Sequence, residues 1–322
     1  VLIFIYRIKP YRLNCKVISV GNITLGGTGK TALVALIAQY LKEQGRKVAI
    51  LSRGYKRIGF RFSVLGSRPN TEHRTPNTET MGDEPYMLQM NLKDVPVIVD
   101  VNRIRAAKLA MRDYGADTVI LDDGLQQWRI KKDLEIVTID ATCPLGNRKL
   151  IPRGILREPL SSLKRADMFI LTKTNLSPAG QQIKDFLRQI NPKALSIESI
   201  HSPLGFCRLD KPGELSDVNI LTGKTVTLFS AIGDPDSFEG IIRSLGIKIG
   251  LSFRFRDHHN YTQEDLDNII RKSKERNIDI LVTTEKDAAR LCQLPVFFLR
   301  IELKIIKDEQ EFYNRLLRLY TY

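Results

Sequence analysis

The segment "NITLGGTGKTALVALIAQYL", residues 22–41, places three glycines and a Gly-Lys-Thr triplet directly before an apolar run with helical spacing. The residues before it, "KVISVGN" at 16–22, are apolar and β-branched and predict a buried strand. The order strand, glycine loop, helix is typical of a phosphate-binding loop, in which backbone N–H groups at a helix N-terminus hold an anion. The segment therefore predicts an α/β fold with a phosphate site at the start of this helix.

The side chains of the loop predict which phosphates it contacts. Lys30 would reach the β- and γ-phosphates of ATP, and the Thr31 hydroxyl would be a ligand of Mg²⁺. One departure from the pattern G-x-x-x-x-G-K-[ST] is Thr24, which stands at the first glycine position. The alternative is a strand-to-helix turn that merely uses glycine. The predicted phosphate-binding residues are Thr24, Leu25, Gly26, Gly27, Thr28, Gly29, Lys30 and Thr31. A second "TGKT", at 222–225, lacks a glycine-rich run before it and is interpreted as an ordinary turn.

Short apolar strands recur along the chain and alternate with helical segments such as "NRIRAAKLAMRDYG" at 102–115. The pattern predicts a doubly wound, mainly parallel sheet, whose ligands sit at the carboxyl ends of the strands. Residues 56–82 are polar and predict a long loop, a candidate lid. We expect a phosphate-loop domain over residues 1–205 and a smaller α/β domain over 206–322 that closes the site. The predicted strands are "KVAILSRGY", "VPVIV", "DTVIL", "EIVTI" and "MFILT", then "TVTLF", "KIGLSFRF", "DILVT" and "PVFFLRI" in the second domain.

Composition limits the partners of the chain. Its 50 basic and 36 acidic residues leave a net charge of +14, which favours a nucleic acid, a membrane surface or a phosphorylated substrate. The aromatic share is 7% and no aromatic residues are interleaved with a basic stripe, which argues against a nucleic-acid-binding module. The four cysteines are scattered without C-x-x-C spacing, so we expect neither a zinc site nor disulfides, and a reducing cytoplasm.

The first residues, "VLIFIYRIKPYRLNCK", lack an initiator methionine, so we expect further residues upstream. The apolar run is too short to span a bilayer. Followed by basic residues, it is either the end of an interfacial membrane anchor or an element packed on its own domain.

Acidic residues follow one predicted strand and begin one predicted helix. Asp122 and Asp123, in "DTVILDDGLQQ", stand at the carboxyl end of a strand, where a phosphate-loop enzyme holds Mg²⁺; the alternative is a turn or helix cap. Asp83 and Glu84, in "MGDEP", are also typical of a helix start. His258, in "FRDHHNYT", is one of four histidines, and a carboxylate paired with its imidazole would suit deprotonation of a hydroxyl.

Seven segments in this order resemble the tetraacyldisaccharide 4′-kinase family of lipid A biosynthesis: "VGNITLGGTGKT", "LSRGY", "GDEP", "LDDGLQ", "LREPL", "RFRDHHNYT" and "TTEKDAARL". The resemblance covers residues 17 to about 292. It implies transfer of the ATP γ-phosphate to the 4′-hydroxyl of an acylated glucosamine disaccharide 1-phosphate. It also implies a phosphate-loop domain, a smaller α/β domain with the site between them, and an N-terminal membrane anchor.

The resemblance assigns roles to individual residues. It implies that Asp83 is the base and His258 its partner, with Lys30 also catalytic. Thr31, Asp122, Asp123 and Glu84 would form the Mg²⁺ site. The family has Gln-His after its DDG segment, whereas this chain has Gln126 and Gln127, so no imidazole role is assigned there.

The implied location is the cytoplasmic face of the inner membrane of a Gram-negative bacterium. The positive charge of the chain suits an anionic membrane surface and a lipid phosphate, with no nucleic acid as partner. The alternative function is a phosphate-loop ATPase that acts as a partner switch at the membrane. Phosphate release with and without the lipid acceptor distinguishes the two.

Overall fold

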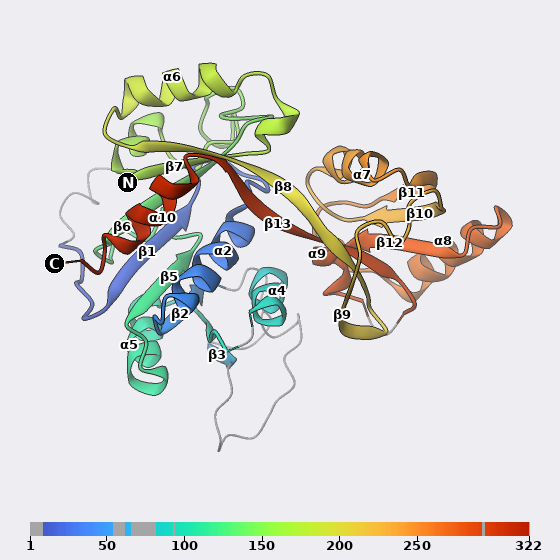
Figure 1. Cartoon of the computed structure of the whole chain (residues 1–322), viewed down its shortest axis with the longest axis horizontal. Helices are drawn as coiled ribbons and strands as arrows, with labels where there is room; N and C mark the ends of the chain where they lie inside the picture. Colours follow the sequence, from blue (N-terminus) through green and yellow to red (C-terminus); the bar gives the residue numbers. More distant parts are fainter. Residues whose placement is uncertain (1–8, 54–61, 66–81, 93, 292–293, 322) are drawn as a thin grey trace. The chain divides into compact units, whose positions relative to one another are not determined.

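The computed structural model describes residues 9–53, 62–65, 82–92, 94–291 and 294–321 (Figure 1). The chain forms two compact units, one of Val1–His201 with Leu303–Tyr322 and the other of Ser202–Glu302. The prediction that the second domain runs to residue 322 is therefore wrong at its C-terminal end. The physical reason is helix α10 (Glu309–Leu317), which buries Phe312 and Leu316 in the core of the first unit.

The first unit is built on a mainly parallel sheet, in which the described strand β3 is antiparallel to β4. The strand order is β8-β7-β6-β1-β5-β2-β4-β3. Strand β1 lies between β5 and β6, with Ile18 opposite both Ile120 and Leu134. The chain winds away from β1 in both directions, which places the loop after β1 at the switch point of a doubly wound sheet. The strands are β1 (Lys16–Gly21), β2 (Val48–Ser52), β3 (Phe62–Leu65), β4 (Val97–Asp100), β5 (Thr118–Asp122), β6 (Leu134–Asp140), β7 (Met168–Thr172) and β8 (Leu195–Arg208).

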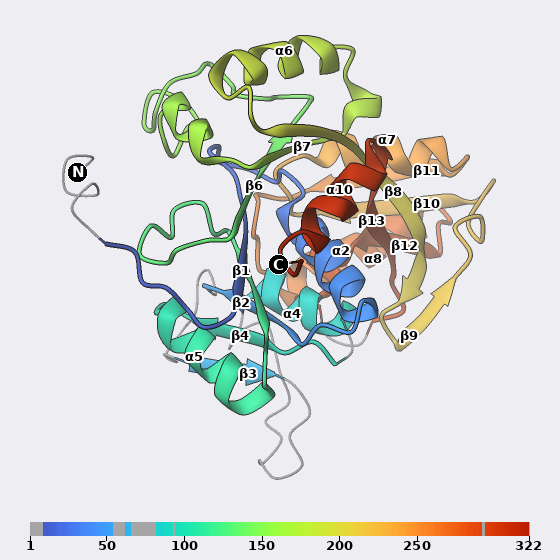
Figure 2. The same cartoon turned by 60° about the vertical axis from the view of Figure 1, so that its left-hand side comes forward.

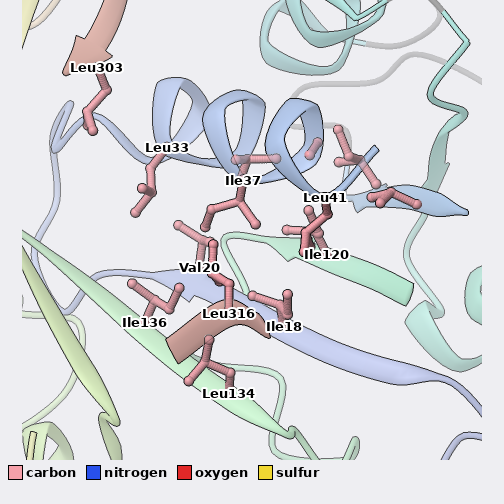
Figure 3. Packing of buried hydrophobic residues seen from close by; sticks show 14 of the residues in the cluster. Ile18, Val20, Leu33, Ile37, Leu41, Ile120, Leu134, Ile136, Leu303 and Leu316 are labelled. Carbon is pink, nitrogen blue, oxygen red and sulfur yellow. The ribbon is translucent and has the colours of Figure 1, made fainter. Parts of the chain in front are cut away.

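Helices cover both faces of this sheet. On one face lie α2 (Lys30–Glu43), α4 (Asp83–Asn91) and α10, and on the other α5 (Arg103–Tyr114) and α6 (Gly180–Ile190). Helices α2 and α10 lie side by side in Figures 1 and 2, with the ring centroids of Tyr40 and Tyr313 4.2 Å apart. Figure 3 shows why α2 docks here: Leu33, Ile37 and Leu41 project from one side of the helix toward the sheet. Each such fully buried side chain contributes about 1.5–3 kcal/mol.

The second unit is a smaller parallel sheet in the order β11-β10-β12-β13, with β9 paired antiparallel to the end of β8. Alternate residues of β10 face opposite ways. Val226 and Leu228 pack in one cluster with Phe238 of α7, whereas Phe229 packs in another with Ile269 of α8. The elements are β9 (Lys211–Ser216), β10 (Thr225–Ser230), α7 (Pro235–Ser244), β11 (Lys248–Arg254), α8 (Gln263–Glu275), β12 (Ile280–Thr284), α9 (Glu285–Ala288) and β13 (Phe297–Lys307).

Other differences from the predictions are local. Residues 62–65, inside the predicted loop 56–82, form β3; residues 56–61 and 66–81 of that loop lie outside the described residues. The predicted boundary at residue 205 falls within β8. The second "TGKT" forms a turn that leads into β10 rather than a helix, as predicted. The apolar start "VLIFIY" lies outside the described residues, and no helix among the described ranges is long and apolar enough to cross a bilayer.

Candidate active site

The glycine loop leaves β1 and ends at Lys30, the first residue of α2. Its last glycine, Gly29, caps the helix in a left-handed conformation with φ of 77°, and no side chain caps the first turn. The first backbone N–H groups of a helix need partners from outside it. A Cβ atom placed on Gly26 or Gly27 would meet nothing within 4 Å, so the loop borders open space. Uncapped donors beside open space suit an anion.

Hydroxyl groups anchor the loop to the ends of neighbouring strands. The buried Thr28 hydroxyl accepts a bond of 2.9 Å from Asn22 Nδ2 and lies 2.7 Å from the hydroxyl of Thr138 in β6. Thr172, the last residue of β7, donates through Oγ1 to the Thr28 carbonyl at 3.3 Å. The loop is therefore held in shape before any ligand binds.

Lys30 and Asp123 face one another at the loop. The Lys30 Nζ lies 3.7 Å from Asp123 Oδ1, and Arg157 donates two bonds of 2.7 and 2.8 Å to the same carboxylate. Burial by itself would raise the pKa of Asp123, but the bonds from Arg157 and the charge of Lys30 hold it below its ordinary value. Asp123 is thus ionised and already neutralised by two cations.

Asp122 has the opposite environment. Its side chain is buried, and its Oδ1 accepts no hydrogen bond from the described residues. Burial, together with the charges of Glu84 and Asp123, raises the pKa of Asp122 to about 7, against the opposing charges of Lys30 and Arg103. A buried carboxylate oxygen without a partner is costly. A cation bound at this oxygen would offset that cost.

These groups fit a magnesium ion, which prefers one or two carboxylates together with phosphate oxygens and water. Asp122 offers an open oxygen, and Thr31 is the second residue of α2, beside the loop. Among the residues that the structure describes, no three His, Cys, Asp or Glu side chains form a complete metal site. Phosphate oxygens would have to supply the remaining ligands.

The two neighbouring aspartates predict opposite effects on stability. Because the pKa of Asp122 is raised to about 7, its ionised form destabilises the protein as pH rises from about 4, the unfolded value, through 7. Asp122→Asn should therefore raise Tm by a few degrees at alkaline pH in the absence of Mg²⁺. Asp123→Asn is the matched control. The lowered pKa of Asp123 contributes stability above the unfolded value, so its loss should lower Tm. Calorimetry on both variants checks this, and an equal fall in Tm for both would contradict it.

Asp83 and Glu84 form the first turn of α4, after Gly82 at φ of 89°. Acidic side chains are favoured at this end of a helix, so the helix-start interpretation of "GDEP" is correct in the structure. The charge of Glu84 also contributes to the raised pKa of Asp122, so Glu84 lies near the carboxylate pair. Asp83 is half-buried next to it.

His258 lies in the second unit, in a left-handed conformation with φ of 62°. Arg290 lies with one terminal nitrogen 3.1 Å from His258 Nδ1, and Lys286 Nζ lies 3.2 Å from Nε2. A guanidinium and an ammonium can only donate, so both ring nitrogens of His258 face cationic donors. Asp83 and His258 belong to different units, so their pairing stays a prediction.

Sequence reasoning missed several polar residues around the loop. Arg157, besides binding Asp123, donates to the Asn22 carbonyl at 3.1 Å. Gln126 also donates to this carbonyl, at 3.1 Å, and to Glu158 at 3.0 Å. The segment "LREPL" contains Arg157 and Glu158 and was the signal for them. Gln126 therefore holds the segment after β1 to the "LREPL" segment.

Arg103 is a further missed residue, because a basic residue at a helix start has no motif of its own. It is buried at the first residue of α5 and donates to the Asp100 carbonyl. Burial lowers its pKa to about 10, although the charge of Asp122 favours the charged form. Arg103 thus partly offsets the acidic charge at the end of β5.

The chain is similar to known proteins along most of its length. Residues 4–321 match the family described as tetraacyldisaccharide-1-P 4′-kinase. The tetraacyldisaccharide 4′-kinase of Halothermothrix orenii is 40% identical over 88% of this chain and 76% of its own, and that of Syntrophus aciditrophicus is 37% identical over 97% and 86%.

A solved structure is also similar. The crystal structure of LpxK from Aquifex aeolicus in complex with ATP superposes with a TM-score of 0.75, at 29% identity, over 98% of this chain and 91% of that one. This similarity shows that the fold matches as well as the sequence, over both units of this chain. The chain belongs to the tetraacyldisaccharide-1-P 4′-kinase family.

Proposed function

We propose that the protein transfers the γ-phosphate of ATP to the 4′-hydroxyl of an acylated glucosamine disaccharide 1-phosphate. The observation that carries the proposal is the meeting, at one edge of the sheet, of an uncapped helix N-terminus, Lys30 and the open oxygen of Asp122. Family membership supports this choice of acceptor. The kinases named among the relatives do not favour the alternative of an ATPase switch.

The residues of the first unit act on the nucleotide. The loop N–H groups hold the phosphates, and Lys30 neutralises charge that develops on the transferred group. Thr31 and Asp122, with Glu84 nearby, would hold Mg²⁺, which would supply positive charge to offset that of the phosphates. Asp123, already bound by Arg157, would position Lys30 rather than contact the metal.

Two residues act on the acceptor. A sugar hydroxyl needs a base before it attacks phosphorus, and Asp83 would take its proton. His258 would pair with that carboxylate and orient it, and its ring is in turn contacted by Arg290 at Nδ1. Both roles follow from the family resemblance.

The location and partner proposals rest on charge. A net charge of +14 suits an enzyme at an anionic membrane, and juxtamembrane basic residues each contribute about 1 kcal/mol to such attraction. The acceptor is a lipid, so the site must be reached from a membrane surface. We place the protein at the cytoplasmic face of an inner membrane.

A transfer assay tests the function. Purified protein is incubated with Mg²⁺ and ATP labelled on the γ-phosphate, with or without the acylated disaccharide 1-phosphate in detergent micelles. The expected label is on the lipid, with little free phosphate formed when the lipid is absent. Equal release of inorganic phosphate with and without lipid would favour the switch instead.

A further inference from the structure

A pocket of about 490 Å³ lies in the first unit under the loop between β6 and β7. Its wall combines apolar side chains with basic ones and includes no acidic residue. The lining residues are Arg148, Lys149, Leu150, Ile151, Pro152, Arg153, Leu156, Pro159 and Leu160. The nucleotide-binding residues described above do not line it.

The part of this segment that projects, residues 146–153, is called loop 146–153 below. Leu150 and Ile151 on it are 45% and 49% exposed to water. Single exposed apolar residues are common on protein surfaces. Here two adjacent ones stand over an apolar pocket and between basic side chains, and such a combined patch marks an interaction site.

Loop 146–153 is internally bonded. Asn147 Nδ2 donates to the Arg153 carbonyl at 2.8 Å, and the Ile151 N–H donates to the Leu156 carbonyl at 3.0 Å. The Arg148 guanidinium stacks over the Phe186 ring of α6 at 4.6 Å. Leu150 and Ile151 are thus displayed by a loop whose own backbone bonds hold its shape, rather than by a frayed segment.

The base of the loop joins the phosphate loop. The Leu25 N–H donates to the Ile155 carbonyl at 2.8 Å, and the Arg157 N–H donates to the Ile23 carbonyl at 2.6 Å. Leu25 is itself 53% exposed. A molecule held at loop 146–153 is therefore next to the proposed site of phosphoryl transfer.

We propose that loop 146–153 docks the protein on an anionic lipid bilayer, with Leu150 and Ile151 inserted among the acyl chains and the basic side chains on the lipid phosphates. Charge complementarity selects this occupant. Arg148, Lys149 and Arg153 surround an apolar tip, which matches a surface with negative headgroups above hydrocarbon. The link to substrate access rests on the proposed function; the docking itself does not.

Sedimentation with vesicles tests the docking. The full chain is mixed with vesicles of phosphatidylcholine alone or of phosphatidylcholine with phosphatidylglycerol. Leu150→Gln with Ile151→Gln should weaken binding to the anionic vesicles about tenfold or more. Arg148→Gln, Lys149→Gln and Arg153→Gln together should weaken it by about 10²-fold, with the remaining binding less sensitive to salt.

Matched control variants replace similar apolar and basic side chains at other exposed positions. Leu204→Gln with Ile220→Gln removes an apolar pair of similar exposure, 42% and 48%, from the second unit. Lys108→Gln, Arg112→Gln and Arg318→Gln lower the net charge equally at exposed positions of the first unit. Both controls should bind anionic vesicles nearly as the parent does.

Turnover on a water-soluble acceptor keeps the outcomes distinct. The loop variants should retain turnover on a short-chain, water-soluble acceptor, because the loop contributes no reacting group. Binding of the loop variants equal to the parent, parent binding to neither vesicle, or equal loss of turnover on the soluble acceptor would each overturn the docking role. Loop-dependent vesicle binding without any phosphoryl transfer would instead overturn the proposed function and leave the docking role intact.

Discussion

Lys30→Ala is expected to lower phosphoryl transfer by about 10²- to 10³-fold or more, the range measured when one group that stabilises transition-state charge is removed. The Lys30 side chain is 14% exposed and its Nζ is 3.7 Å from Asp123, at the end of the uncapped loop. Its loss removes a cation from the proposed phosphate site. The fold should survive, because Asp123 keeps two bonds from Arg157.

The chain offers a matched control for this variant. Lys224 stands in the second "TGKT", which forms a turn before a strand. Lys224→Ala makes the same chemical change in the same local sequence, and it should leave transfer unchanged. Rates measured at saturating ATP and lipid, with Tm recorded for both variants, check the pair. A near-normal rate for Lys30→Ala would contradict the nucleotide assignment.

Strands β1, β2 and β4 to β7 of the first unit could be predicted because they are buried on both faces. Strands such as β5, with every residue buried, are apolar in sequence and flanked by helical periodicity. Helix α10 could not be assigned to this unit from its sequence. Its apolar residues Phe312 and Leu316 show that it packs, but the partner strands lie far away along the chain. Strand β3 was not predicted because the sequence around it is rich in turn-forming residues.

The positions of candidate site residues could be predicted where a local sequence motif contains them. The glycine loop and the Asp122–Asp123 pair each follow a strand, and strand ends of a parallel sheet meet at one edge. The different environments of Asp122 and Asp123 could not be predicted. It depends on Arg157, which reaches Asp123 from a segment that is distant in sequence. Only the folded chain shows which carboxylate has an open oxygen.

The surroundings of His258 likewise come from residues distant in sequence. Arg290 is held near Asp287, at 3.6 Å, and this buried carboxylate also accepts from the Ala231 N–H at 3.1 Å and from the Thr284 hydroxyl at 2.6 Å. Arg290 in turn donates to the His259 carbonyl at 3.2 Å and faces His258 Nδ1. The segment "TTEKDAARL" therefore positions the imidazole of "RFRDHHNYT".

Asp83→Ala and His258→Ala should each lower turnover strongly, and the double variant should be little slower than the poorer single one. General base catalysis typically contributes about 10²- to 10⁴-fold, and groups that act as one unit are not additive. Because Asp83 lies in the first unit and His258 in the second, such a cycle also tests whether the two units meet at the acceptor.

His259→Ala is the matched control for this cycle, since the neighbouring imidazole is bound to Asp265 at 2.9 Å and stacked on Phe255. It should combine additively with Asp83→Ala. ATP affinity, measured separately by calorimetry, should survive in every variant, because none of these side chains belongs to the phosphate loop. Strictly additive losses for Asp83 and His258 would rule out a joint role. Loss of ATP affinity in Asp83→Ala would move that carboxylate to the metal, beside Glu84 and Asp122, and leave the acceptor hydroxyl without a base from the first unit.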